Sequence, residues 1–275
     1  MAGGATETQR PPAQRGMYIL PSLFTAGNIA IGYYIIVQSI RGATMGDNWA
    51  FDRAAIAIAV AILFDGLDGR IARMTNTSSA FGRELDSLAD VITFGVAPSL
   101  LAYLWGVRMV PPSDYPIIHA RLVHFGVVIW FLFLICGACR LARFNISVNP
   151  QPRNPGRPDR KYFVGMPIPA GAGVIGAVIH FESGAPIDNI WMSVVWLALV
   201  AFTGFLMVSS WRFWSGKEID IGARKPGRFL VLLVVVLGIL FEWSKIALLI
   251  LALGYLMSGV LARVAYSWER RFAAV

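Results

Sequence analysis

The sequence contains two closely spaced pairs of aspartates, Asp65 with Asp68 and Asp86 with Asp90. Residues three or four apart lie on the same face of an α-helix, so each pair would present two carboxylates on one side of its helix. Because only a short turn would join the two helices, the four carboxylates can converge. Four negative charges that close together repel strongly unless a cation lies among them. Oxygen ligands suit a hard cation, so the sequence predicts a site for Mg²⁺ or Mn²⁺.

Small residues and one arginine lie beside the aspartates. Gly69 and Gly82 lack a side chain, so a bulky ligand can approach the helix backbone there. Ala72 extends this small surface, and Arg73 supplies a permanent cation suited to a phosphate. A single aspartate could instead cap a helix, as Asp86 could, or be solvated at a membrane surface. Four of them on two facing helices favour a functional site for a metal-bound diphosphate.

The elements that must position these residues are apolar helices. Of the 275 residues, 56% are hydrophobic and 15% are charged, which is typical of a bilayer-embedded protein and not of a soluble domain. A helix needs roughly 20 mostly apolar residues to cross a bilayer. The sequence therefore predicts an all-α, polytopic membrane protein with eight transmembrane helices, at 17–37, 54–74, 86–105, 123–144, 164–181, 190–211, 229–243 and 246–266. The seventh segment is short, so a re-entrant last hairpin is an alternative.

The basic residues predict how these helices are oriented. With the N-terminus in the cytosol, all of the 24 Lys and Arg lie on the cytosolic side except Arg41, Arg53, Arg108, Arg121 and Lys245. Cytoplasmic loops carry such an excess, so both termini are expected in the cytoplasm. This predicts a cytosolic tail over 1–16 and one transmembrane domain over 17–271, in the cell inner membrane with the aspartates facing the cytoplasm. The net charge of +8 then indicates contact with anionic membrane lipids and not with nucleic acid.

The segment from Phe64 to Gly95 also carries a recognisable pattern. In order, it holds Asp65, Asp68, Gly69, Ala72, Arg73, Gly82, Asp86 and Asp90, with the fixed gaps that resemble the signature of the CDP-alcohol phosphotransferase family. The resemblance implies a core of six transmembrane helices, a homodimer and two metal ions held by the four aspartates. It also implies that Asp90 is the catalytic base that takes the proton from the acceptor alcohol. Gly69, Ala72, Arg73 and Gly82 would line the pocket for the cytidine diphosphate of the lipid substrate.

Further segments bear on the acceptor alcohol. The stretches 20–34, 140–145, 161–173 and 206–217 resemble those family members that make phosphatidylserine. This resemblance implies transfer of the phosphatidyl group from CDP-diacylglycerol to L-serine, with release of CMP. Glycerol 3-phosphate or inositol phosphate is the alternative acceptor within the family. A cation-coupled transporter is the alternative from another class, although such sites usually lie near the bilayer midplane.

A zwitterionic serine needs a cation for its carboxylate. Arg143 or Lys217 is the first choice from the sequence, with Arg140 and Lys161 as further candidates, because all four are expected near the cytosolic face beside the aspartates. Ordinary positive-inside topology explains any one of them equally well. Asn28, in the first apolar segment, is expected to hydrogen-bond the cytidine or position an aspartate, and helix packing is the alternative.

Overall fold

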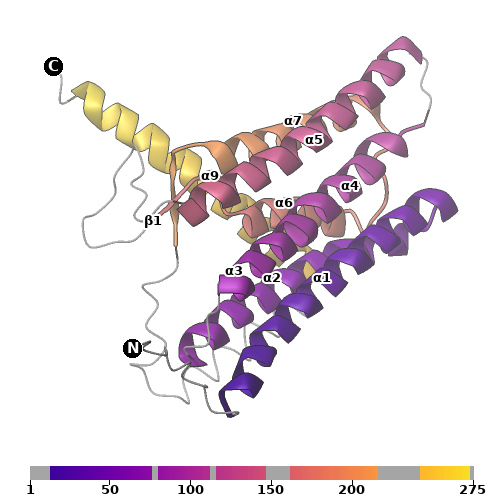
Figure 1. Cartoon of the computed structure of the whole chain (residues 1–275). Helices are drawn as coiled ribbons and strands as arrows, with labels where there is room; N and C mark the ends of the chain where they lie inside the picture. The colour runs from indigo at the N-terminus through magenta and orange to yellow at the C-terminus, as the bar shows by residue number, and fades with distance from the viewer. Residues whose placement is uncertain (1–12, 76–79, 112–115, 147–161, 216–241, 273–275) are drawn as a thin grey trace, which may run out of the picture.

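The chain forms a bundle of long helices with one very small sheet. The computed structural model describes residues 13–75, 80–111, 116–146, 162–215 and 242–272. Helix α1 (Ala13–Met45) turns at Gly46 into α2 (Asn48–Thr75), and the two pack side by side (Figure 1). These bounds place residues 13–16 of the predicted cytosolic tail inside α1, while residues 1–12 lie outside the described part.

The third rod of the bundle is one continuous helix that changes its winding twice. It comprises α3 (Ala80–Asp90), the π-helical turn η1 (Val91–Val96), α4 (Ala97–Tyr103) and a second π-helical turn η2 (Leu104–Arg108). Such π-turns are rare and frequently occur at functional sites. The first begins at the residue after Asp90, so the helix widens directly beyond the last predicted aspartate.

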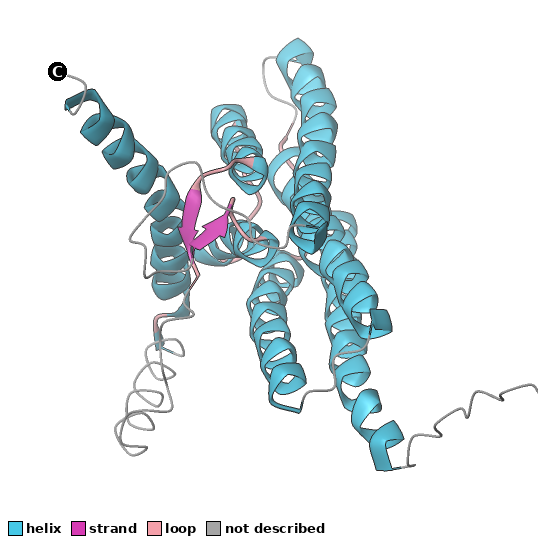
Figure 2. Cartoon of the chain, turned by 60° about the vertical axis from the view of Figure 1, so that its left-hand side comes forward, coloured by secondary structure: helices cyan, strands magenta, loops and turns pink. Residues whose placement is uncertain are grey.

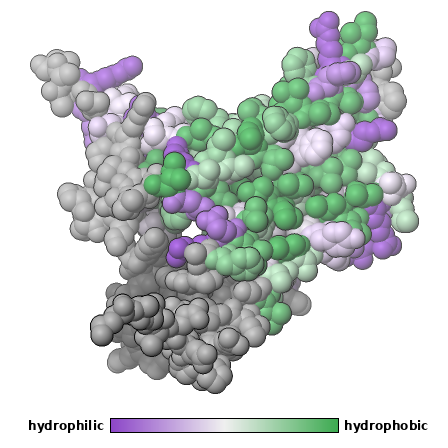
Figure 3. Space-filling model, in the orientation of Figure 1, coloured by the Kyte–Doolittle hydropathy of each residue, from purple (hydrophilic) through white to green (hydrophobic). Residues whose placement is uncertain are grey.

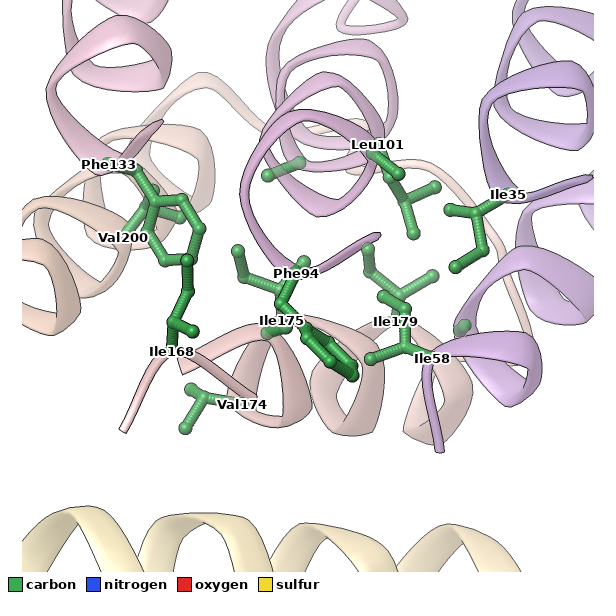
Figure 4. Close-up of a cluster of buried hydrophobic side chains, with 14 of the residues drawn as sticks. Ile35, Ile58, Phe94, Leu101, Phe133, Ile168, Val174, Ile175, Ile179 and Val200 are labelled. Carbon is green, nitrogen blue, oxygen red and sulfur yellow. The ribbon is translucent and has the colours of Figure 1, made fainter. Parts of the chain in front are cut away.

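Three more helices complete the core. Helix α5 (Pro116–Ile146) packs against α7 (Ile190–Val208), and the short α6 (Ile168–Phe181) lies between α2 and α9 (Ser244–Phe272). The largest buried cluster joins side chains from most of these helices, including Ile58 of α2, Phe94 of η1 and Ile175 of α6 (Figure 4). Small residues make this packing close: a Cβ at Gly176 of α6 would lie 3.0 Å from the backbone carbonyl oxygen of Ala55.

Two short strands depart from the purely helical expectation. Strand β1 (Tyr162–Val164) pairs antiparallel with β2 (Arg212–Trp214), and both lie beside α9 (Figure 2). The predicted fifth helix therefore does not begin at Val164, because that residue belongs to the strand and the helix begins at Ile168. Likewise the predicted sixth helix ends at Val208 and not at Trp211.

The apolar surface and helix lengths confirm a polytopic, all-α membrane protein. Among the residues that the structure describes, five helices are long and apolar enough to cross a bilayer: Leu23–Met45, Phe81–Arg108, Pro116–Ile146, Ile190–Val208 and Ser244–Glu269. Hydrophobic residues cover much of the visible face, and hydrophilic ones gather towards helix ends (Figure 3). Helix α6 has 14 residues, about 21 Å, and falls short of a bilayer core. The predicted segment at 229–243 lies almost wholly outside the described residues, so the count of eight spans stays a prediction.

A buried hydrogen-bond chain joins three helices at the end of the bundle away from the aspartates. The Nδ1 atom of His180 lies 2.6 Å from Oδ1 of Asp52, and its Nε2 atom lies 2.9 Å from Oγ of Ser244. These residues come from α6, α2 and α9, so the chain fixes the start of α9 to the core. Satisfied buried polar chains of this kind specify how elements pack.

Candidate active site

Three of the four predicted aspartates converge in the structure. Carboxylate oxygens of Asp65 on α2 and of Asp86 and Asp90 on α3 all lie within 4.8 Å of one another. Asp65 and Asp86 are partly buried, and Oδ1 of Asp90 is buried. The fourth, Asp68, lies in the helical backbone of α2 one turn beyond Asp65, and its side chain is outside the described part.

The charges of this cluster require compensation. At an effective dielectric constant of about 20, two carboxylates 4–5 Å apart repel by about 3–4 kcal/mol. Three such groups held by two helices therefore favour binding of a cation. The donor set consists of oxygen atoms only, which fits Mg²⁺ or Mn²⁺ and does not fit a softer metal.

The remaining signature residues lie on the same two helices, α2 and α3. Gly82 lies one helical turn before Asp86 on α3, so it continues the face that carries Asp86 and Asp90. Gly69, Ala72 and Arg73 lie in the last part of α2, where the backbone is helical and the side chains are outside the described part. Their roles in a nucleotide pocket stay predictions.

Helix α1 holds the segment that follows Asp90. The hydroxyl of Thr93 in η1 donates a 2.9 Å hydrogen bond to the backbone carbonyl of Asn28. Next to it, a Cβ at Gly32 would lie 3.0 Å from the Cα of Thr93, so only glycine permits this approach of α1 to the π-turn. The side chain of Asn28 is buried, and its Oδ1 has no hydrogen-bond partner in the described part. Asn28 thus contributes to the position of Asp90 through its backbone, and a role for its amide stays a prediction.

Arg143, in the last turn of α5, binds backbone carbonyls. Its Nη1 donates to Val208 O at 2.8 Å, and its Nη2 donates to Val164 O at 2.9 Å and to Ser209 O at 3.2 Å. Two of these carbonyls belong to the C-terminal end of α7, where helix carbonyls lack intrahelical partners and favour a cation. The guanidinium therefore joins α5 to α7 and β1, and this use competes with the predicted role in acceptor binding.

The tight turn after β1 makes room for this arginine. Gly165 has φ of +75°, and a Cβ there would lie 2.4 Å from Met207 O and 2.7 Å from Nη2 of Arg143. A side chain at this position would both strain the backbone and displace the guanidinium. Asn145 makes a further connection, because its Nδ2 donates a 2.9 Å hydrogen bond to Oγ of Ser87, between Asp86 and Asp90 on α3.

Arg140 is placed differently from Arg143 although it lies one turn earlier on the same helix. The residue is only 7% exposed, and its guanidinium lies over the rings of Phe144 and Phe163. Tyr255, Arg143 and Asp90 lie close enough to Arg140 to interact with it electrostatically. The sequence did not indicate Phe163 or Tyr255, because they reach this place only through strand pairing and the packing of α9. Lys161 and Lys217 lie outside the described residues.

Comparisons with known proteins agree with this site. The family model described as CDP-alcohol phosphatidyltransferase matches residues 18–183, which contain all four aspartates, Arg140 and Arg143. The chain belongs to this family, and it is therefore a membrane-embedded transferase.

Named relatives extend over most of the chain. A CDP-diacylglycerol–serine O-phosphatidyltransferase of Helicobacter pylori is 34% identical over 89% of this chain and 91% of its own length. The enzyme of the same name from Saccharomyces cerevisiae is 39% identical over 58% of this chain and 53% of its own length. An archaetidylserine synthase of Methanothermobacter thermautotrophicus is 32% identical over 66% of this chain and 69% of its own length.

Proposed function

We propose that this protein transfers the phosphatidyl group of CDP-diacylglycerol to L-serine, giving phosphatidylserine and CMP. The observation that carries the proposal is the convergence of the Asp65, Asp86 and Asp90 carboxylates within 4.8 Å, on the signature that the family model matches. The relatives that are serine O-phosphatidyltransferases support serine as the acceptor.

Asp90 is the proposed general base of the reaction. It accepts the proton of the serine hydroxyl, whose oxygen then attacks the phosphorus bonded to the diacylglycerol oxygen. The bond from this phosphorus to the CMP oxygen breaks, and CMP leaves with the electron pair. Its Oδ1 atom is buried, and the π-turn begins at the next residue of the chain.

Two divalent cations, Mg²⁺ or Mn²⁺, would be held by Asp65, Asp68, Asp86 and Asp90 and would neutralise the diphosphate and the charge on the transferring phosphoryl oxygens. The chain's own contribution is to fix these ligands on two packed helices. Gly69, Ala72 and Gly82 would leave space for the cytidine diphosphate, and Arg73 would bind a phosphate oxygen.

An apolar groove offers a place for the lipid tails. It has a volume of about 200 Å³ and lies between α2, α6 and α9. Its wall includes Ile62 of α2, one turn before Asp65, and Gly173 and Gly176 of α6. Because the groove is apolar and leads along α2 towards the carboxylates, a diacylglycerol chain bound there would keep its diphosphate beside Asp65.

The proposed orientation of the protein in the membrane follows from the distribution of basic residues. We place the active site on the cytoplasmic side of the cell inner membrane, with both termini in the cytoplasm. A homodimer is expected from the family resemblance.

An acceptor panel tests the proposed reaction. The purified full chain is incubated with CDP-diacylglycerol and Mn²⁺, and CMP release is measured with L-serine, glycerol 3-phosphate or inositol phosphate. The expected result is release with serine alone. Release only with a phosphorylated acceptor would contradict serine as substrate and keep the transferase chemistry, whereas no release with any acceptor would contradict the reaction itself.

A further inference from the structure

A buried hydrogen-bond chain joins the same three helices that wall the apolar groove. Nδ1 of His180 on α6 lies 2.6 Å from Oδ1 of Asp52 on α2, and its Nε2 lies 2.9 Å from Oγ of Ser244 on α9. A carboxylate only accepts hydrogen bonds, so Nδ1 of His180 donates to Asp52. Every residue that lines the groove also belongs to α2, α6 or α9. The chain and the groove are therefore parts of one three-helix arrangement.

The hydrogen-bond chain lies beyond the end of the groove that is farthest from the carboxylates. On each of the three helices, a residue that lines the groove lies three or four positions from a member of the chain, about one helical turn. These residues are Ala55 of α2, Ala177 of α6 and Leu248 of α9. At its other end the groove reaches Ile62, one turn before Asp65. The groove thus extends between the proposed catalytic site and the hydrogen-bond chain.

Further contacts tie the helices together at the far end. Gly184, which follows α6, has φ of +73°, and a Cβ there would lie 2.6 Å from the backbone nitrogen of Asp52. The turn after α6 therefore packs directly on the start of α2. Nζ of Lys245 donates a 2.7 Å hydrogen bond to Oγ of Ser183 in the same turn. The first two residues of α9, Ser244 and Lys245, are thus both bound to the end of α6.

Helix α9 has little apolar packing to hold it in place. Only 11% of its apolar span is buried, against 56% for the span Phe81–Arg108. Towards the other end of the groove, the hydroxyl of Tyr255 donates a 3.1 Å hydrogen bond to the backbone carbonyl of Trp214, and the ring of Phe213 packs over Gly259. Because specific contacts at both ends of the groove hold α9, loss of the contacts at one end would move this wall of the groove.

We propose that Asp52, His180 and Ser244 are positioning residues for the lipid donor. They set the distance of α9 from α2 and α6, and so determine how tightly the groove binds an acyl chain of CDP-diacylglycerol. This assignment rests on the proposed function and deepens it. The three residues act through the walls of the groove, from the end of the bundle opposite Asp90.

A chain that only stabilised the fold would give a different result when broken. Its loss would impair the reaction of every donor to the same degree, whatever the length of the acyl chains. A chain that positions the wall of the groove matters only to a donor whose acyl chain reaches along that wall, because only this donor buries apolar surface there. The dependence on acyl chain length therefore separates the two roles.

The test compares a long-chain donor, dioleoyl-CDP-diacylglycerol, with a short-chain donor, dihexanoyl-CDP-diacylglycerol. The kcat and KM for each donor are measured by CMP release with L-serine for the purified full chain and for Ser244→Ala, Ser244→Thr and Lys245→Met. Ser258→Ala is the matched control, because the hydroxyl of Ser258 donates to the carbonyl of Tyr255 within α9 itself. The KM for serine reports whether each variant keeps the acceptor site.

Ser244→Ala should raise the KM for the dioleoyl donor roughly three- to tenfold, the range that loss of one hydrogen bond produces. The KM for the dihexanoyl donor and the KM for serine should stay unchanged. Ser244→Thr keeps the hydroxyl and should restore the KM for the dioleoyl donor. Lys245→Met should act in the same direction as Ser244→Ala and less strongly, because Lys245 is exposed. Ser258→Ala should behave as the wild type.

An unchanged KM for the dioleoyl donor in Ser244→Ala, or an equal change for both donors, would overturn the assignment. The same effect in Ser258→Ala would also count against it. If Ser244→Ala does not fold, the ratio of the two donors in Lys245→Met decides, since this variant removes only an exposed contact. Failure of the proposed function is distinguishable, because then the wild-type protein itself would release no CMP with serine from either donor.

Discussion

Single residues of the candidate site owe their positions to packing that lies outside the signature. Asp90 is held because Thr93 in the following turn hydrogen-bonds Asn28 and contacts Gly32 of α1. Arg143 is held by carbonyls of α7 and β1. We therefore expect substitution of Asp90 to lower turnover and substitution of Arg143 to lower stability.

Asp90→Asn should lower kcat by about 10²- to 10⁴-fold, because the amide cannot accept the proton of the acceptor hydroxyl. Binding of Mn²⁺, measured by calorimetry, should weaken and persist, since Asp65 and Asp86 remain. Asp188→Asn is the control, because Asp188 is exposed in the connection between α6 and α7. Turnover at the wild-type rate in Asp90→Asn would exclude Asp90 as the base.

Arg143→Gln should mainly lower stability. The variant loses charged hydrogen bonds to the end of α7 and to β1, which are worth about 1.5–3 kcal/mol each when formed with a charged group. Thermal unfolding in detergent should therefore shift to lower temperature. Activity with serine and with L-serinamide, which has no carboxylate, should fall in equal proportion, and a selective rise in the serine KM would instead assign Arg143 to the acceptor.

The helices of this protein can be predicted from its sequence, whereas its two short strands cannot. Long apolar runs predict the helices, and the spacing of Asp86 and Asp90 predicts that they share a face, because both signals are local. Strand β1 has only three residues and pairs with β2 some fifty residues later, so no local pattern reveals it. The different surroundings of Arg140 and Arg143 were likewise beyond prediction, since they depend on what packs against each guanidinium.

The groove between α2, α6 and α9 gives a prediction at the scale of elements. Gly173→Leu should fill it, because even a Cβ at this position would lie 3.2 Å from Cδ1 of Ile62. The KM for long-chain CDP-diacylglycerol should rise about tenfold or more, while a short-chain donor should be affected less. Gly254→Leu on α9 is the control, because nothing lies within 4 Å of a Cβ there. Equal effects on both donors would argue against the groove as the tail site.

The whole molecule places its two polar clusters at opposite ends of the bundle. The carboxylates lie near one end, and the Asp52–His180–Ser244 chain lies at the other. Basic residues gather in the sequence on the side of the carboxylates, which predicts that this end faces the cytoplasm.

Cysteine labelling checks this orientation. In a background with Cys136 and Cys139 replaced by alanine, a cysteine introduced by Glu182→Cys should react with an impermeant maleimide in intact cells. A cysteine introduced by Asn145→Cys should react only after permeabilisation. The reverse pattern would place the active site on the outer side of the membrane.

The central claim is that a carboxylate-bound divalent metal supports transfer of a phosphatidyl group to serine. Its most direct test is serine-dependent CMP release by the purified protein, measured before and after removal of divalent cations with EDTA. We expect CMP and phosphatidylserine to form in equal amounts, EDTA to stop the formation of both, and Mn²⁺ or Mg²⁺ to restore it. Equal rates with and without EDTA would contradict it.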